Sequence, residues 1–189
     1  ALGFRRGAGA LANILEENGL TDHPAFAQAK IRGIRSLSGH SESTDLTNDV
    51  NGGPSGIGIA TAAGKAAFWD MMGADESLKI FAVEGEFALT SGHSQEFKTQ
   101  AVANQVGKRL RVLMSYNNAG IDDELIGSVV KEDTYDIENQ WSSYGWNVIR
   151  VDNATDYDQV VAALKTMEEA DEFDRRPIIV IGRTVKGYW

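Results

Sequence analysis

The sequence predicts an α/β fold in which a doubly wound, mostly parallel sheet has helices on both faces. Two observations carry this prediction. From residue 56 onward, short apolar runs alternate with segments of helical periodicity. The apolar runs are also nearly continuous, rather than alternating with polar residues. Strands of that kind are buried on both faces, which is typical of a parallel sheet covered by crossover helices.

Each expected element follows from a local signal. Strands are expected at the short apolar runs, which are 79–83, 111–116, 146–151 and 177–181. Helices are expected where apolar or small residues recur at helical spacing, at 56–72, 95–106, 134–144 and 156–170. Two further helices, 8–17 and 24–34, are expected before a polar loop at 36–54. A loop of that length inside a compact domain is usually functional.

Composition limits the classes of function. The 189 residues suit a single domain, and 42% of them are apolar, which indicates a globular protein. With 18 basic and 27 acidic residues the net charge is −9, which disfavours binding to nucleic acid or to an anionic membrane. There is no cysteine and no apolar run long enough to span a bilayer. We therefore expect a cytoplasmic protein that binds neither nucleic acid nor membrane.

Polar residues with oxygen ligands follow the first two strands. Glu84, Gly85 and Glu86 come after the first strand, and a segment beginning at Asn117 follows the second. Because the carboxyl ends of parallel strands meet at one edge, these groups are expected to converge there. Carboxylate, carboxamide and carbonyl oxygens suit Mg²⁺ or Ca²⁺ held together with phosphates. Taken alone, such residues are more often turn formers.

A glycine-rich segment at 52–58 strengthens the case for a ligand site. It closes the polar loop and opens the helix expected at 56–72, with glycines where a phosphate or ring could lie against bare backbone. It is neither a G-x-G-x-x-G fingerprint nor a Walker sequence, so an ordinary nucleotide site is not indicated.

Three other features of the sequence point to structure rather than to chemistry. His93 lies in a polar segment that we expect to be exposed, which disfavours a catalytic role. Asn153 is expected to cap the helix that begins near residue 156. The short basic run at 108–111 is expected to be solvated, at the entrance to a strand.

Five ordered blocks together resemble one family. They are Gly-Pro-Ser-Gly-Ile-Gly at 53–58, Glu-Gly-Glu at 84–86, Asn117 with Ile-Asp at 121–122, Tyr-Gly-Trp-Asn-Val-Ile at 144–149, and Arg-Thr-Val-Lys-Gly at 183–187. In this order they resemble the thiamine-diphosphate-binding domain of transketolases, over roughly residues 36 to 187. The blocks near 145–149 and 184–188 are also similar to the homodimeric pyruvate dehydrogenase decarboxylating subunit.

The resemblance implies a metal site. The family's Gly-Asp-Gly motif, whose aspartate binds the metal, matches Val83, Glu84 and Gly85, so that Glu84 stands where the family has aspartate. Asn117 matches the second side-chain ligand, and the carbonyl of Ala119 is the expected backbone ligand. The longer Glu84 side chain is expected to displace the metal, to weaken its binding or to abolish it.

The resemblance also implies cofactor contacts. Gly53 and Ser55 would lie against the aminopyrimidine, and Ile121 would lie beside the thiazolium ring. Gly85 and Glu86 are assigned to cofactor binding. His40, in Ser-Gly-His at 38–40, would face thiamine and substrate as the catalytic histidine. The match places an insertion at 89–94, and Glu96 corresponds to a glutamate that lies at the family's dimer interface.

The implied activity is transfer of a two-carbon ketol unit between sugar phosphates, with thiamine diphosphate and Mg²⁺ (or Ca²⁺) as cofactors. We expect residues 1–189 to form a single, incomplete diphosphate-binding domain of a larger homodimeric enzyme, inactive alone. A pyrimidine-binding domain of the same enzyme or of a partner subunit would complete the site. The alternatives are a non-catalytic assembly module, a domain of a 2-oxo acid dehydrogenase decarboxylating subunit, and an unrelated nucleotide-binding domain.

Overall fold

The computed structural model describes residues 19, 22, 56–119, 136–169 and 174–186. The chain divides into two compact units, residues 1–51 and 52–189, and every helix and strand described below belongs to the second unit. The helices expected at 8–17 and 24–34 and the loop expected at 36–54 lie outside the described residues.

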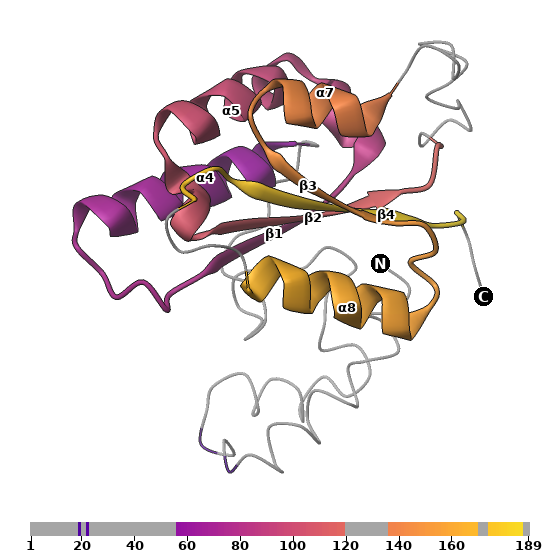
Figure 1. Ribbon diagram of the computed structural model, residues 1–189. Helices are drawn as coiled ribbons and strands as arrows, with labels where there is room; N and C mark the ends of the chain where they lie inside the picture. The colour runs from indigo at the N-terminus through magenta and orange to yellow at the C-terminus, as the bar shows by residue number, and fades with distance from the viewer. Residues whose placement is uncertain (1–18, 20–21, 23–55, 120–135, 170–173, 187–189) are drawn as a thin grey trace. The chain divides into compact units, whose positions relative to one another are not determined.

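A four-stranded parallel sheet forms the centre of the second unit (Figure 1). The strands are β1 (Ile80–Gly85), β2 (Leu110–Tyr116), β3 (Asn147–Val151) and β4 (Ile178–Arg183). They lie in the order β1-β2-β4-β3, and all three pairings are parallel. The expectation of a parallel α/β sheet is therefore confirmed.

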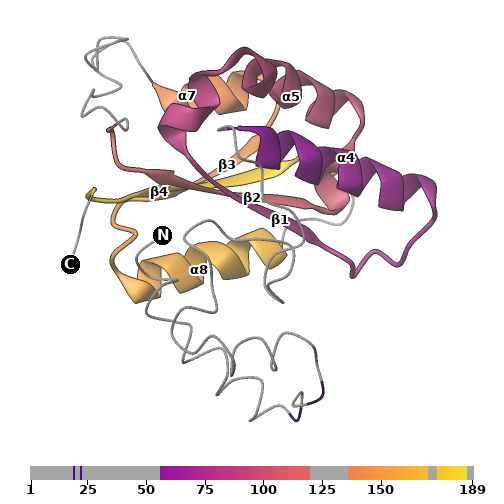
Figure 2. The same cartoon turned by 180° about the vertical axis from the view of Figure 1, so that it is seen from behind.

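Helices cover both faces of this sheet, as Figures 1 and 2 show. On one face lie α4 (Ile57–Met71), α5 (Gly92–Ala103) and α7 (Ile137–Ser143). On the other lies α8 (Tyr157–Glu168). Two short 3₁₀ helices, η2 (Glu86–Thr90) and η3 (Val106–Lys108), flank α5. Among the described helices none has the length and apolar character needed to cross a membrane.

Some element boundaries differ from expectation. The helix expected at 95–106 begins at Gly92 and ends at Ala103. Its first turn is polar, yet Ser94 is fully buried there, which apolar periodicity does not reveal. The strand expected at 177–181 continues to Arg183, because Gly182 and Arg183 still pair with β2. The residue that caps α8 is Asp156, not Asn153.

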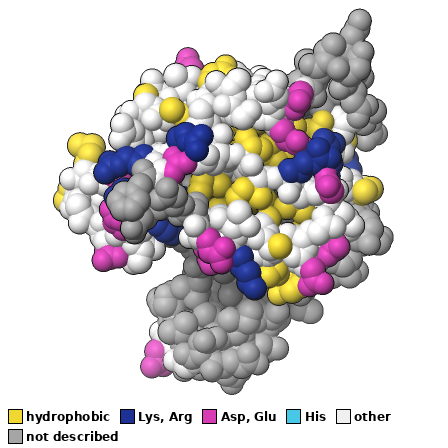
Figure 3. All heavy atoms as spheres, in the orientation of Figure 1, with side chains coloured by type: hydrophobic (Ala, Val, Ile, Leu, Met, Phe, Trp, Pro, Cys, Tyr) yellow, Lys and Arg dark blue, Asp and Glu magenta, His cyan; other side chains and the backbone are white. Residues whose placement is uncertain are grey.

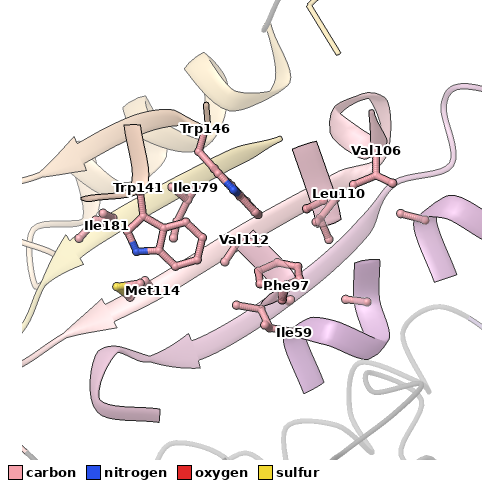
Figure 4. Close-up of a cluster of buried hydrophobic side chains, with 14 of the residues drawn as sticks. Ile59, Phe97, Val106, Leu110, Val112, Met114, Trp141, Trp146, Ile179 and Ile181 are labelled. Carbon is pink, nitrogen blue, oxygen red and sulfur yellow. The ribbon is translucent and has the colours of Figure 1, made fainter. Parts of the chain in front are cut away.

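Aromatic side chains fill the larger core, between the three-helix face and strands β2 and β4 (Figure 4). The rings of Trp141 and Trp146 meet edge to face with centroids 4.8 Å apart, and Phe97 lies 5.3 Å from Trp146. The indole N–H of Trp146 donates to the carbonyl of Lys98 at 3.0 Å, so its polar atom is satisfied inside the core.

The opposite face of the sheet is covered unevenly. There α8 packs on β3 and β4 through Val151, Ala163 and Met167. At β1, an edge strand of the described sheet, Phe81 and Val83 keep 53% and 74% of their surface exposed. Large apolar side chains therefore remain accessible on this strand.

The basic run at 108–111 is not solvated, so that expectation was wrong. Arg109 and Arg111 are only 2% and 5% exposed. Arg109 pairs with Asp70 and donates to the carbonyls of Asp75 at 2.6 Å and Leu78 at 3.2 Å. Its fork of donors satisfies carbonyls in the turn between α4 and β1, which makes its burial possible.

Lys98 is a buried cation whose partners are neutral. It is 1% exposed, and its ammonium donates to the side-chain oxygens of Gln95 at 3.1 Å and Gln140 at 3.0 Å. The same ammonium lies 4.6 Å from the centroid of the Trp141 ring. Burial lowers the pKa of Lys98 from 10.5 to about 8.

Lys98 should make stability depend on alkaline pH. Between pH 8 and 10.5 the unfolded chain holds the Lys98 proton while the folded chain has lost it, so the unfolding free energy should rise across this range. The rise is at most about 3 kcal/mol. Urea unfolding at pH 7, 8, 9 and 10 should show it in the wild type and not in Lys98→Met. The exposed Lys165→Met is the control, and an identical pH dependence in Lys98→Met would contradict this account.

Replacing two glycines separately with alanine should change the free energy of unfolding in opposite directions. A Cβ on Gly107 would lie 2.2 Å from the carbonyl oxygen of Arg176, whereas a Cβ on Gly64, within α4, would meet nothing within 4 Å. Thermal unfolding should show Gly107→Ala destabilised by about 2–3 kcal/mol or more. Gly64→Ala should be stabilised by about 0.5–1 kcal/mol because alanine is the better helix former. Equal effects would contradict the packing of η3 against residues 175–176.

Candidate functional site

The candidate site lies at the carboxyl ends of β1, β2 and β4. Because these strands are parallel and adjacent, the segments that follow them leave the sheet at one edge. Those segments begin at Glu86, Asn117 and Thr184. Three sets of hydrogen bonds connect this edge, and each is described in turn.

Glu84 joins the end of β1 to the start of α4. One carboxylate oxygen accepts the backbone N–H of Gly56 at 3.2 Å, and the other accepts that of Gly85, also at 3.2 Å. Gly56 is the N-cap of α4, so the carboxylate lies where the helix dipole favours negative charge. The glycine segment and the acidic residue therefore meet, although they are far apart in the sequence.

Gly56 is tightly enclosed by the segment that follows β1. Its φ is +83°, and a Cβ would lie 2.5 Å from the Ser94 hydroxyl and 2.8 Å from Nε2 of His93. Ser91 bridges these two side chains, with its hydroxyl 2.9 Å from that of Ser94 and 3.2 Å from Nε2 of His93. Only glycine fits at this position.

His93 is exposed, as expected, but its nearness to Gly56 was missed. The sequence held one indication of this contact, because His93 lies in the segment 89–94, where the family match places an insertion. What the sequence does not reveal is that this segment folds back over the first residue before α4.

Glu86 joins the end of β1 to the segment after β2. It is 1% exposed, and its Oε1 accepts the backbone N–H groups of Asn117 at 3.1 Å and Ala119 at 3.2 Å. Asn118 between them has a left-handed φ of +54°. The side-chain oxygen of Asn117 also accepts the N–H of Ala119, at 2.9 Å. The carboxylate of Glu86 therefore lies inside the protein, against this turn.

Thr184 connects β4 to β2 at the same edge. Its hydroxyl lies 2.9 Å from that of Ser115, and its N–H donates to the carbonyl of Tyr116 at 2.8 Å. The guanidinium of Arg183 lies 5.2 Å from the centroid of the Tyr116 ring. The block at 183–187 therefore begins beside the segment that carries Asn117.

The described residues at this edge suit a divalent metal held partly by a phosphate ligand. Glu84, Asn117 and the carbonyl of Ala119 offer three hard oxygen donors of different kinds. Each carboxylate oxygen of Glu84 accepts one N–H and keeps a further lone pair. In the described part of the chain, no group of three or more His, Cys, Asp or Glu side chains is arranged to hold a metal ion.

The structure describes five of the nine site residues proposed from the sequence. Glu84, Gly85, Glu86, Asn117 and Ala119 all lie at the carboxyl edge. His40, Gly53, Ser55 and Ile121 lie outside the described residues. On the face shown in Figure 3, basic and acidic side chains are interspersed, and no continuous basic tract is visible among the described residues.

Comparisons with known proteins agree with this architecture. A probable transketolase from Streptococcus pneumoniae is 30% identical over 158 residues, which cover 79% of this chain and 22% of that protein. A dihydroxyacetone synthase from Pichia angusta is 30% identical over 157 residues, covering 79% and 21%. The chain thus spans about a fifth of the length of these curated relatives.

Solved transketolases have a similar fold. A transketolase from Pichia stipitis, in complex with sedoheptulose-7-phosphate, has a TM-score of 0.61 and 27% identity, covering 84% of this chain and 24% of that chain. A transketolase from Campylobacter jejuni has a TM-score of 0.63 at 23% identity, covering 77% and 22%, and supports the fold alone.

The resemblance noted in the sequence is therefore confirmed at the level of the family. The family described as transketolase, thiamine diphosphate binding domain, matches residues 25–189, which is most of the chain. On that match, this chain belongs to the transketolase thiamine-diphosphate-binding domain family.

Proposed function

We propose that this chain binds thiamine diphosphate and a divalent metal, Mg²⁺ or Ca²⁺, at the carboxyl edge of its sheet. It would do so as part of a transketolase-like transferase that moves a two-carbon ketol unit between sugar phosphates. The observation that carries the proposal is the pair of hydrogen bonds by which Glu84 links Gly56 to the end of β1. These contacts hold an acidic ligand beside a glycine-rich helix start.

Different described residues would bind the metal and the phosphate. Glu84, Asn117 and the carbonyl of Ala119 would hold the metal. Gly85, where a Cβ would meet nothing within 4 Å, leaves open space beside the backbone for a phosphate. When bound, thiamine diphosphate supplies a carbon nucleophile and an electron sink.

Residues outside the described part would contact the rest of the cofactor. Gly53 and Ser55 would lie against the aminopyrimidine, Ile121 beside the thiazolium ring, and His40 toward the substrate. These assignments come from the family resemblance and remain proposals.

The catalytic unit would be larger than this chain. A pyrimidine-binding domain, from the same enzyme or from a partner subunit, would complete the cofactor site within a cytoplasmic homodimer. The coverage of only about a fifth of the curated relatives supports this proposal. The sugar phosphate in the Pichia stipitis complex supports the substrate class by analogy.

One observation favours a second candidate, a non-catalytic assembly module. Glutamate replaces the family's aspartate at position 84, and both of its carboxylate oxygens already accept backbone N–H groups. A carboxylate engaged in this way could serve the fold in place of a metal.

Calorimetric titration should separate these two candidates. Thiamine diphosphate with Mg²⁺ should release heat on binding the wild-type chain, and excess EDTA should abolish it. Asn117→Ala should weaken binding by about 10–100-fold because a ligand is lost. The exposed Glu168→Gln on α8, on the other face, should bind as the wild type does.

Glu84→Asp is the informative variant, since it restores the family's residue. Binding by both the wild type and Glu84→Asp supports the cofactor domain. No heat from the wild type but clear heat from Glu84→Asp supports the assembly module, whose site has lost its metal. No heat from either chain refutes cofactor binding by this polypeptide.

Turnover should require the proposed pyrimidine-binding domain. The 189-residue chain, supplied with thiamine diphosphate, Mg²⁺ and a ketose phosphate donor with an aldose phosphate acceptor, should form no transfer product. A coupled assay that detected sustained two-carbon transfer by the lone polypeptide would contradict the proposed division of the site.

A further inference from the structure

We infer that Glu86 is a positioning residue, which holds the turn 117–119 so that Asn117 and the carbonyl of Ala119 face the metal. The inference rests on the proposed function and changes the role of Glu86, which the sequence had assigned to direct cofactor binding. It is carried by the burial of Glu86 and by its two hydrogen bonds across the edge.

The turn has the form of a small anion-binding concavity. Asn118 is left-handed, with a φ of +54°, and the N–H groups on either side of it both donate to one oxygen of Glu86. Backbone N–H groups arranged in this way commonly bind phosphate or carboxylate oxygens. In this chain the anion is an internal side chain, so the concavity is already filled by the protein itself.

The location of Glu86 argues against a direct cofactor contact. The side chain is 1% exposed, and Oε1 lies against the Asn117 and Ala119 amides on the protein side. Because two N–H groups donate to Oε1, this buried oxygen is satisfied where it is. Moving it toward a diphosphate would bring two negative groups together and would leave both amides without this acceptor.

Glu86 also affects the side chain of the candidate metal ligand. The N–H of Ala119 has two acceptors, Oε1 of Glu86 and the side-chain oxygen of Asn117. While Glu86 accepts this N–H, the Asn117 oxygen can turn toward a metal without leaving the amide unsatisfied. Without Glu86, the side-chain oxygen of Asn117 would be the remaining acceptor for the Ala119 N–H. That hydrogen bond would keep the Asn117 oxygen in the turn and away from a metal.

One short segment therefore organises both halves of the described site. Glu84 fixes the start of α4, and Glu86, two residues later, fixes the turn after β2. The first carboxylate is partly buried, whereas the second is fully buried.

Amide hydrogen exchange in the chain free of metal and cofactor tests the positioning role directly. Glu86→Leu should raise the exchange rates of the Asn117 and Ala119 amides by at least about 10-fold, with the larger effect at Asn117. Glu86→Gln keeps an acceptor oxygen and should restore most of the protection. The exposed Glu168→Gln on α8 should change neither amide, and unchanged exchange in β2 shows that each variant is folded.

Metal dependence supplies the second measurement. Glu86→Leu should raise the Mg²⁺ concentration needed for half-maximal binding of thiamine diphosphate by about 10–100-fold. Glu86→Gln should stay within a few-fold of the wild type. If Glu86 bound the metal directly, loss of its charge in Glu86→Gln would raise the Mg²⁺ requirement well beyond a few-fold, and the positioning role would be overturned.

The two measurements separate this inference from the proposed function. If the Glu86 variants change amide exchange as expected but the wild type binds no cofactor, the proposed function is refuted. The finding that Glu86 holds the turn 117–119 is then unaffected. Unchanged exchange in Glu86→Leu, or binding with the wild-type Mg²⁺ dependence, overturns the positioning role and leaves the proposed function intact.

Discussion

The hydrogen bond from the Gly56 amide to Glu84 is the contact on which the described site depends. It joins the first turn of α4 to the end of β1, residues that are 28 positions apart. The parallel sheet brings the two ends close, but this bond determines which group of α4 faces the strand. A Cβ at Gly56 would clash with Ser94 and His93, so the residue that donates this hydrogen bond has to be glycine.

Much of the fold could be predicted because its strongest signals are local. The apolar runs of β1, β2 and β4 and the small-residue pattern of α4 can be recognised in any window of the chain. The start of α5 could not be placed, since its first turn is polar and Ser94 is buried beside Gly56, which is distant in the sequence. Burial of Arg109 was missed for the same reason, because its acceptors belong to the turn before β1.

The site was predictable in its location and less so in its internal contacts. Glu84, near the end of β1, and Asn117, directly after β2, lie at the same carboxyl edge because the strands are parallel, so their types and order were enough to indicate this edge. The sequence could not show that Glu86 turns inward, because strand alternation ends at Gly85 and a 3₁₀ helix begins. The residue types single out the segment 84–86, and the geometry distinguishes the partly buried Glu84 from the fully buried Glu86.

The exposed side of β1 bears on how this polypeptide would behave in isolation. Phe81 and Val83 extend from a strand that is also an edge of the described sheet. Unprotected strands with apolar side chains act as templates for pairing between molecules, and proteins normally shield them. We therefore expect concentrated solutions of the chain to self-associate through this strand, and a charged side chain at Val83 to improve solubility without touching Glu84.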